Sequence, residues 1–175
     1  MSAVPQHDWP ADIYAALKAA EVKQVAYVPD AGHGRLLELC AADATMRMVT
    51  LTTEEEGVAL AAGAWLGGQR AVLLMQSSGV GNCMNTLAMI ETCRFPLLTL
   101  VTMRGEFGEF NPWQVPMGIA TPESLKLANV IVHRAGEAAR VGETVAGAAR
   151  LAFASYRAVA VLLPQQHIGA KSFQK

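Results

Sequence analysis

The chain has 175 residues, of which 52% are hydrophobic and 17% charged, and its formal net charge is -1. This length suffices for one domain, spanning residues 1–175, with a sizeable core. The balanced charge and the lack of any run of Lys or Arg exclude electrostatic binding to nucleic acids or anionic membranes. The high hydrophobic fraction favours a subunit that covers part of its surface with a partner.

The cysteines and the apolar runs predict a cytoplasmic protein. Cys40, Cys83 and Cys93 form no CxxC pair, so we expect neither a disulfide framework nor a zinc knuckle. No apolar run reaches the ~18 residues that a membrane span needs. Asp8 and Pro10 stand where the core of a signal peptide would lie.

Short apolar strands alternate with helices along the chain. We expect strands at residues 24–28, 47–51, 71–75, 97–101, 130–132 and 159–163. Spacing and helix-start signals predict helices at 8–21, 36–40, 54–67, 79–93, 122–127 and 137–156, with an irregular segment at 103–120. Uninterrupted apolar strands are typical of a parallel sheet buried on both faces. The pattern predicts an α/β fold, a doubly wound, mostly parallel six-stranded sheet with helices on both faces.

Polar or glycine-rich clusters directly follow four of the predicted strands. They comprise residues 30–34, 52–56, 76–82 and 104–118. Ligands of such sheets bind outside the carboxyl ends of the strands. We therefore expect the four clusters to converge on one edge of the sheet.

Three acids open the helix predicted from Glu54. Thr53 and Glu56 have the spacing of a capping box, in which Thr53 is the N-cap and Glu56 bonds back to its amide. The helix dipole favours an acid here by about 0.3–1 kcal/mol, so a structural role accounts for all three. If one acid is catalytic instead, capping by Glu56 leaves Glu54 or Glu55. Small residues behind them indicate that another group approaches this helix closely: Gly57, Ala59, Ala61, Ala62, Gly63 and Ala64.

Two glycines, Gly79 and Gly81, lie between a predicted strand and the helix that follows it. Glycines in this position free backbone amides to approach a ligand, often an anion. The lysine of a P-loop is missing, and the segment does not match GxGxxG. A tight turn and a binding loop therefore both stay open.

The long irregular segment contains Phe107, Phe110 and Trp113, which argue against disorder. Segments of this length inside compact domains are usually lids or binding loops, so we expect it to contact a ligand or another subunit. His33, between two glycines after the first strand, is either a polar contact for a substrate or a solvated loop residue. No Ser/His/Asp order, HExxH motif or Cys/His ligand spacing appears.

Three blocks, in this order, resemble those of thiamine diphosphate enzymes. Glu54 followed by Val58, Ala61 and Gly63 resembles the E-x8-G helix of the domain that binds the aminopyrimidine ring, and residues 75–82 resemble the second loop of that domain. The third block is most similar to sulfopyruvate and phosphonopyruvate decarboxylases, which split a 2-oxo acid bearing a second anionic group. It comprises Arg104, Gly105, Gly108, Glu109, Gln114, Met117 and Gly118.

The resemblance implies a catalytic role for Glu54, with Glu55 as the fallback if the helix begins one residue later. The family glutamate bonds N1′ of the aminopyrimidine and favours the imino tautomer, whose nitrogen removes the C2 proton of the thiazolium ring. Contacts to thiamine diphosphate are implied for Glu54, Gln76, Ser77, Gly79, Gly81 and Asn82. Contacts to the substrate are implied for His33, Arg104 and Gln114.

Departures from the family place the rest of the active site on another chain. The Gly-Asp-Gly motif that holds the diphosphate and Mg²⁺ is absent. We therefore expect a pyrimidine-binding alpha subunit without metal ligands, and a beta subunit that carries this motif and binds Mg²⁺, in a hetero-oligomer with alpha–alpha contacts. The adjacent histidine pair of pyruvate decarboxylases is also absent. Sulfopyruvate, which would give sulfoacetaldehyde and CO₂, is therefore favoured over pyruvate.

Other functions stay open beside this one. Phosphonopyruvate or another 2-oxo acid would suit the same residues. A non-catalytic scaffold or regulatory subunit of the same fold would add nothing to cofactor affinity. A flavodoxin-like nucleotide binder is less favoured, because no phosphate-binding motif follows the first predicted strand.

Overall fold

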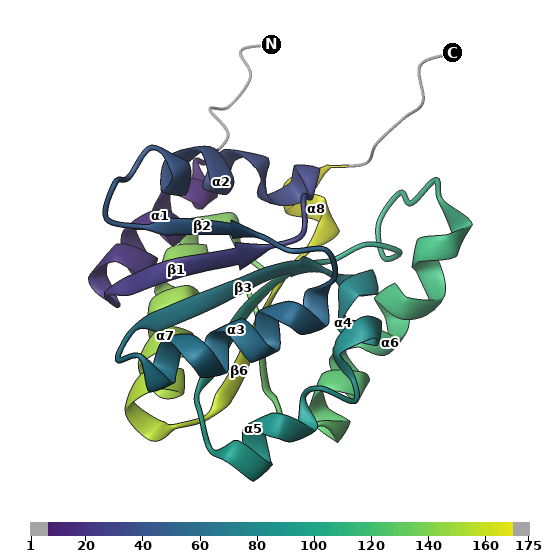
Figure 1. Cartoon of the computed structure of the whole chain (residues 1–175). Coiled ribbons are helices and arrows are strands. Elements are labelled where there is room, and N and C mark those ends of the chain that lie inside the picture. Colours follow the sequence, from purple (N-terminus) through teal and green to yellow (C-terminus); the bar gives the residue numbers. More distant parts are fainter. Residues whose placement is uncertain (1–6, 170–175) are drawn as a thin grey trace.

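The computed structural model describes residues 7–169 and contains the predicted alternation of strands and helices (Figure 1). The strands are β1 Val22–Tyr27, β2 Arg47–Thr50, β3 Arg70–Gln76, β4 Leu97–Thr102, β5 Ile131–Arg134 and β6 Ala158–Leu163. The α-helices are α1 Trp9–Ala19, α2 Gly34–Ala41, α3 Glu54–Leu66, α4 Ser77–Cys83, α5 Ala88–Cys93, α6 Val115–Leu127, α7 Val141–Ser155 and α8 Gln165–Ile168. Short 3₁₀ helices are η1 Ala31–His33, η2 Pro112–Gln114 and η3 Ala138–Arg140.

The strands form one parallel sheet in the order β2-β1-β3-β4-β6-β5. The central strands β4 and β6 are buried along their whole length, whereas the edge strands β2 and β5 are partly exposed. This agrees with the uninterrupted apolar runs of the sequence, because a central parallel strand is covered on both faces. The predicted doubly wound α/β fold is confirmed.

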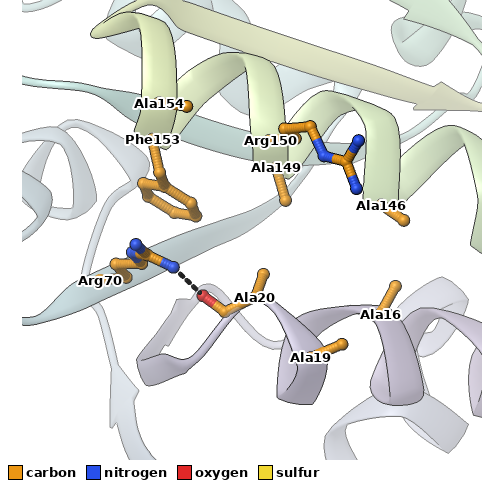
Figure 2. A pocket seen from close by; sticks show the side chains of 9 residues that line it. All are labelled: Ala16, Ala19, Ala20, Arg70, Ala146, Ala149, Arg150, Phe153 and Ala154. Carbon is orange, nitrogen blue, oxygen red and sulfur yellow. Dashed lines mark hydrogen bonds between the residues drawn. The ribbon is translucent and has the colours of Figure 1, made fainter.

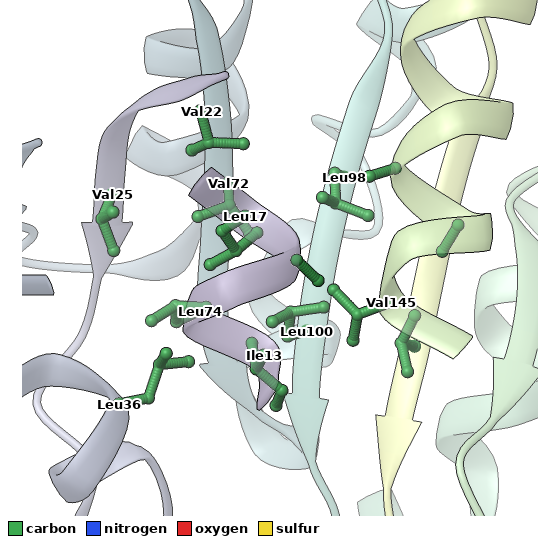
Figure 3. Packing of buried hydrophobic residues seen from close by; sticks show 14 of the residues in the cluster. Ile13, Leu17, Val22, Val25, Leu36, Val72, Leu74, Leu98, Leu100 and Val145 are labelled. Atoms are coloured by element: carbon green, nitrogen blue, oxygen red, sulfur yellow. The ribbon is translucent and has the colours of Figure 1, made fainter. Parts of the chain in front are cut away.

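Alternate residues of each strand pack against different helices. On β3, Val72 and Leu74 belong to a core shared with α1, α2 and α7 (Figure 3). Their neighbours Leu73 and Met75 belong to a second core, shared with α3, α4, α5 and α6. The sheet is therefore covered on both faces, and α3 lies on the same face as α4 and α6 (Figure 1).

The helix after β3 begins earlier than predicted. Helix α4 starts at Ser77, directly after β3, so Gly79 and Gly81 lie inside a short helix and not in a turn. Both glycines are in close packing positions: a Cβ on Gly79 would lie 2.5 Å from the carboxyl group of Glu54, and a Cβ on Gly81 would lie 3.2 Å from Sδ of Met117. Tertiary contacts, not turn geometry, therefore explain these glycines.

The segment predicted to be irregular is about half helical. Helix α6 begins at Val115, whereas the sequence predicted a helix start at Pro122, which lies inside the observed helix. Gly118 is a poor helix former, but a Cβ there would overlap the carbonyl oxygen of Arg104. Close packing of α6 on the end of β4 thus overrides the local propensity.

No helix of residues 7–169 is long and apolar enough to cross a membrane.

Candidate active site

The carboxyl ends of neighbouring strands converge as predicted. Asp30 follows β1, Glu54 follows β2 and Gln76 ends β3. Together they line a cavity of about 190 Å³, whose other walls are Val28, Pro29 and Ser78. Two carboxylates and an amide thus face one cleft that has an apolar wall.

Glu54 is the first residue of α3 and is only 8% exposed. The side-chain amide of Asn82 donates a 2.8 Å hydrogen bond to its Oε2. Its carboxyl group lies against Gly79, where only a glycine leaves room for it. Two elements therefore hold this carboxylate in place, α3 through its backbone and α4 through Asn82 and Gly79.

The other two acids of the triplet do not line the cleft. Glu55 accepts a hydrogen bond from Oγ1 of Thr53, and Oε2 of Glu56 accepts one of 2.8 Å from the backbone N–H of Thr52. Thr53 is the N-cap residue, but its side chain caps no backbone amide. The hydrogen bonds predicted for the capping box are therefore wrong, because Glu56 bonds the backbone N–H of Thr52 and not that of Thr53. Of the three acids, Glu54 is the buried one.

Asp30 belongs to the site although the sequence reasoning did not select it. Its Oδ1 accepts from Nε2 of Gln76 at 2.6 Å and its Oδ2 accepts from Oγ1 of Thr102 at 2.6 Å. Burial by itself raises the pKa of Asp30, but the bonds from Thr102 and Gln76 outweigh it and hold the pKa below its ordinary value. The available signal was its position directly after an apolar strand, in a cluster expected to converge on this edge.

Gln76 and Gln114 continue this network. Oε1 of Gln76 accepts from Nε2 of Gln114 at 3.3 Å and from Oγ of Ser78 at 3.5 Å. Oε1 of Gln114 is buried and has no hydrogen-bond partner among the described residues. An unpartnered buried acceptor is costly, so this atom is suited to accept a bond from a ligand.

Ser77 and His33 are buried and do not line the cleft. Ser77 is fully buried, with its Oγ accepting from the backbone N–H of Arg104 at 3.1 Å. His33 is 1% exposed, and its Nε2 lies 3.4 Å from the carbonyl oxygen of Met75. Burial lowers the pKa of His33 and outweighs the opposing effect of Asp30. Both predicted contact residues therefore bond backbone groups next to the site. A direct contact to a ligand stays a prediction for both.

Arg104 follows β4 and is engaged by an acid of its own loop. Its Nε and Nη2 donate to the two carboxylate oxygens of Glu109, at 2.7 and 2.6 Å. The hydrogen bond from Arg104 lowers the pKa of Glu109 to about 2. The structure thus pairs this guanidinium with a carboxylate, and the predicted contact of Arg104 to a substrate stays a prediction.

Some larger cavities lie away from these groups. One of about 280 Å³ lies between α1 and α7 and is lined mainly by alanines (Figure 2). Arg70, the first residue of β3, borders it and donates to the carbonyl oxygen of Ala20. Because Arg70 and Gln76 are at opposite ends of β3, this cavity lies at the other end of the sheet from Glu54.

No group of three or more His, Cys, Asp or Glu side chains within residues 7–169 is arranged to hold a metal ion.

Comparisons with known proteins identify the family of this chain. Residues 10–107 match the family described as thiamine pyrophosphate enzyme, N-terminal TPP binding domain. The chain is 36% identical to sulfopyruvate decarboxylase subunit alpha of Methanothermobacter thermautotrophicus, over 86% of this chain and 92% of that protein. It is 37% identical to phosphonopyruvate decarboxylase of Streptomyces viridochromogenes, over 69% of this chain but only 31% of that protein.

A solved structure shares the fold. The 2-oxoglutarate:ferredoxin oxidoreductase from Magnetococcus marinus superposes with a TM-score of 0.76 at 14% identity, over 91% of this chain and 29% of that chain. The family match, the identity to relatives and the shared fold agree. This chain belongs to the thiamine pyrophosphate enzymes and carries their N-terminal, cofactor-binding domain.

Proposed function

We propose that this chain is the alpha subunit of a thiamine diphosphate-dependent 2-oxo acid decarboxylase that converts sulfopyruvate to sulfoacetaldehyde and CO₂. The observation that carries the proposal is the placement of Glu54. Its carboxylate is buried at the start of a helix, bonded to Asn82 and seated against Gly79. The relatives named sulfopyruvate decarboxylase subunit alpha support the choice of reaction.

The residues present fit the aminopyrimidine end of the cofactor. The cleft offers the Glu54 carboxylate as an acceptor, Gln76 as an amide, and Val28 with Pro29 as an apolar wall. The buried, unpartnered Oε1 of Gln114 is a further acceptor for an amino group. These acceptors and the apolar wall match an aromatic ring that carries both a nitrogen to protonate and an amino group.

The chain's own residues hold and move a proton in this proposal. Glu54 would hold the proton at a nitrogen of the aminopyrimidine ring, as an acid–base group within hydrogen-bond reach does. Asn82 fixes the orientation of the Glu54 carboxylate, and Gly79 leaves space for it. When bound, the cofactor supplies an electron sink for the bond that breaks as CO₂ leaves.

Substrate recognition is assigned to the far side of the cleft. Arg104 and Gln114 follow β4 and precede α6, and Arg104 borders a small cavity together with Asp30 and Thr102. The N–H groups of Arg104 suit a distal sulfonate or phosphonate. The amide N–H of Gln114 donates to Gln76, so Gln114 is assigned to the amino group of the cofactor. We assign His33 an indirect part, below this cavity. A relative named phosphonopyruvate decarboxylase makes phosphonopyruvate the second candidate substrate.

A partner subunit completes the site in this proposal. The Gly-Asp-Gly motif is absent from the sequence, so diphosphate and Mg²⁺ are assigned to a beta subunit. An apolar patch is available for contact with it, formed by Pro112, Trp113, Pro116, Met117 and Ala120. Trp113 is 87% exposed, and Met117 packs against Gly81 of α4. A chain that covers this patch would lie beside the proposed cofactor site.

We assign the complex to the cytoplasm. Cys40, Cys83 and Cys93 are free thiols, a state that a reducing compartment preserves.

Co-expression with a chain that carries the Gly-Asp-Gly motif tests the proposal. The complex is expected to release CO₂ from sulfopyruvate only when thiamine diphosphate and Mg²⁺ are present. Glu54→Gln should lower kcat by about 10²–10⁴-fold, the usual effect of losing a general acid–base group. Glu56→Gln is the matched control, because Glu56 is exposed and bonds only locally.

The same complex separates the alternatives. Full activity of Glu54→Gln would contradict the assigned role of this residue. If the chain adds nothing to the affinity of its partner for thiamine diphosphate, it is a scaffold subunit. Faster turnover of phosphonopyruvate than of sulfopyruvate would make phosphonopyruvate the assigned substrate. The assigned decarboxylation would stay the same.

A further inference from the structure

One carboxylate in the loop between β4 and η2 is unusually well bonded. Oε2 of Glu109 accepts from Nε of Arg104, from the backbone N–H of Gly105 and from Nε2 of Gln165, at 2.7, 3.2 and 3.0 Å. Oε1 of Glu109 accepts from Nη2 of Arg104 and from the backbone N–H of Asn111, at 2.6 and 3.0 Å. The Glu109 side chain is 3% exposed. These bonds fix both the loop and the plane of the Arg104 guanidinium.

Gln165 connects this loop to the carboxyl end of β6, the strand that pairs with β4. It is 3% exposed and begins α8, two residues after β6 ends. Its Oε1 accepts from the backbone N–H groups of Glu106 and Phe107, at 3.1 and 3.0 Å, while its Nε2 donates to Glu109. Its own backbone N–H donates to Oε1 of Glu106 at 2.9 Å. Both ends of the amide are therefore used, and neither a carboxylate nor an apolar side chain provides both bonds.

The position of Arg104 depends on this connection. Its backbone N–H is anchored on Ser77, and its guanidinium is held by Glu109 and lies near the ring of Phe110, 5.9 Å from the centroid. Glu109 engages Nε and Nη2, and within residues 7–169 no hydrogen bond uses Nη1. The Arg104–Glu109 pair has no net charge, so it would recognise an anion through directed N–H groups and not through bulk attraction.

We propose that Gln165 is a positioning residue for substrate specificity: by bonding Glu109 it orients Arg104 toward the distal anionic group of the 2-oxo acid. The proposal rests on the proposed function, in which Arg104 contacts that group. Gln165 touches no reacting atom in it. Its effect is therefore on substrate affinity, and the proton transfer assigned to Glu54 is untouched.

Gln165→Glu in the assembled complex tests the proposal. A carboxylate still accepts from Glu106 and Phe107, but it faces the Glu109 carboxylate where an N–H group stood. The repulsion should displace Arg104 and raise KM for sulfopyruvate about tenfold or more, the effect of losing one charge-assisted bond, with a much smaller change in kcat. Gln166→Glu is the matched control, because this neighbouring glutamine is exposed.

A second variant removes the same bond without adding a charge. The side chain of Gln165→Met has a similar length but lacks both the N–H group that bonds Glu109 and the acceptor for the loop amides. It should raise KM for sulfopyruvate with a much smaller change in kcat, and it carries the test if Gln165→Glu does not fold.

The outcomes separate this proposal from the one on which it rests. A wild-type complex that neither binds thiamine diphosphate nor decarboxylates sulfopyruvate overturns the proposed function. An active wild-type complex in which Gln165→Glu leaves KM unchanged overturns the positioning role alone. Losses in kcat and in thermal stability in both Gln165 variants, without a selective rise in KM, assign Gln165 a structural role and also overturn it.

Discussion

The side-chain amide of Asn82 donates a 2.8 Å hydrogen bond to Oε2 of Glu54, joining α4 to the first residue of α3. The two residues are 28 positions apart in the sequence. This bond orients the carboxylate that we assign to proton transfer, and it occupies one of the two carboxylate oxygens. The other oxygen, Oε1, lies against Gly79. Changes at Asn82 and Gly79 should therefore alter catalysis without touching Glu54 itself.

Asn82→Asp should lower the rate of the reaction. The substitution replaces the N–H donor by a second carboxylate, which repels the Glu54 carboxylate. Misplacement of a catalytic group by ~1 Å can cost about 10²-fold in rate. Asn82→Ala is the control, because it removes the bond without adding a charge and should cost less. The kcat of both variants at one pH measures the difference, and an unchanged kcat in Asn82→Asp would contradict the assignment.

Gly79→Ala should lower activity more than stability. The added Cβ would lie 2.5 Å from the carboxyl group of Glu54, which is the movable end of a side chain. The carboxyl group can shift at small cost to folding, but misplacement of a catalytic group by ~1 Å can cost about 10²-fold in rate. Steady-state kinetics and thermal unfolding of the same sample measure the two effects. A fall in melting temperature with unchanged kcat would show that the glycine serves packing alone.

Gly57→Ala should destabilise the chain. A Cβ there would overlap Leu73 on β3 and would lie 2.9 Å from Leu51. Overpacking of a core costs about 1–3 kcal/mol, which exceeds the roughly 0.5–1 kcal/mol gained by replacing a helical glycine with alanine. Gly63→Ala on the same helix is the control: no atom lies within 4 Å of its added Cβ, so it should stabilise. Urea unfolding of both variants measures the difference, and equal shifts would refute it.

Glu109→Gln should make stability less dependent on pH. The pKa of Glu109 falls from its ordinary 4.5 to about 2 in the folded chain, chiefly through the bond from Arg104. A depressed folded-state pKa stabilises the fold above the unfolded-state pKa, and this contribution is lost as the pH falls toward about 2. The variant should therefore be less stable than the wild type at neutral pH, and the difference should shrink between pH 4.5 and 2. A constant difference across this range would contradict the pairing.

The order of elements could be predicted because its signals are local. Uninterrupted apolar runs identified β4 and β6, whose every residue is buried. Thr53 and Gly67 were recognisable as the ends of α3 from residue types that favour helix termini. The predicted starts of α4 and α6 were wrong. Gly79, Gly81 and Gly118 lie in these helices because distant residues come too close there for a larger side chain. A single sequence does not distinguish such a glycine from one in a turn.

The site was predictable as a location but not as an arrangement. Clusters after the strands identified the carboxyl edge of the sheet, since parallel strands bring these ends together. The family resemblance already implied Glu54 as the acid, whereas adding Asp30 and pairing Arg104 with Glu109 required the structure. Both of these depend on which way a side chain points once the helices are packed.

The sequence alone determined the class of this protein, since apolar periodicity, the acid at the helix start and the missing Gly-Asp-Gly motif are properties of the chain itself. The tertiary structure decided which groups meet. Asn82 reaches Glu54 over 28 residues, and Gln165 reaches Glu109 over 56. Bonds over such separations form only after the sheet has aligned its strand ends, so no local pattern encodes them.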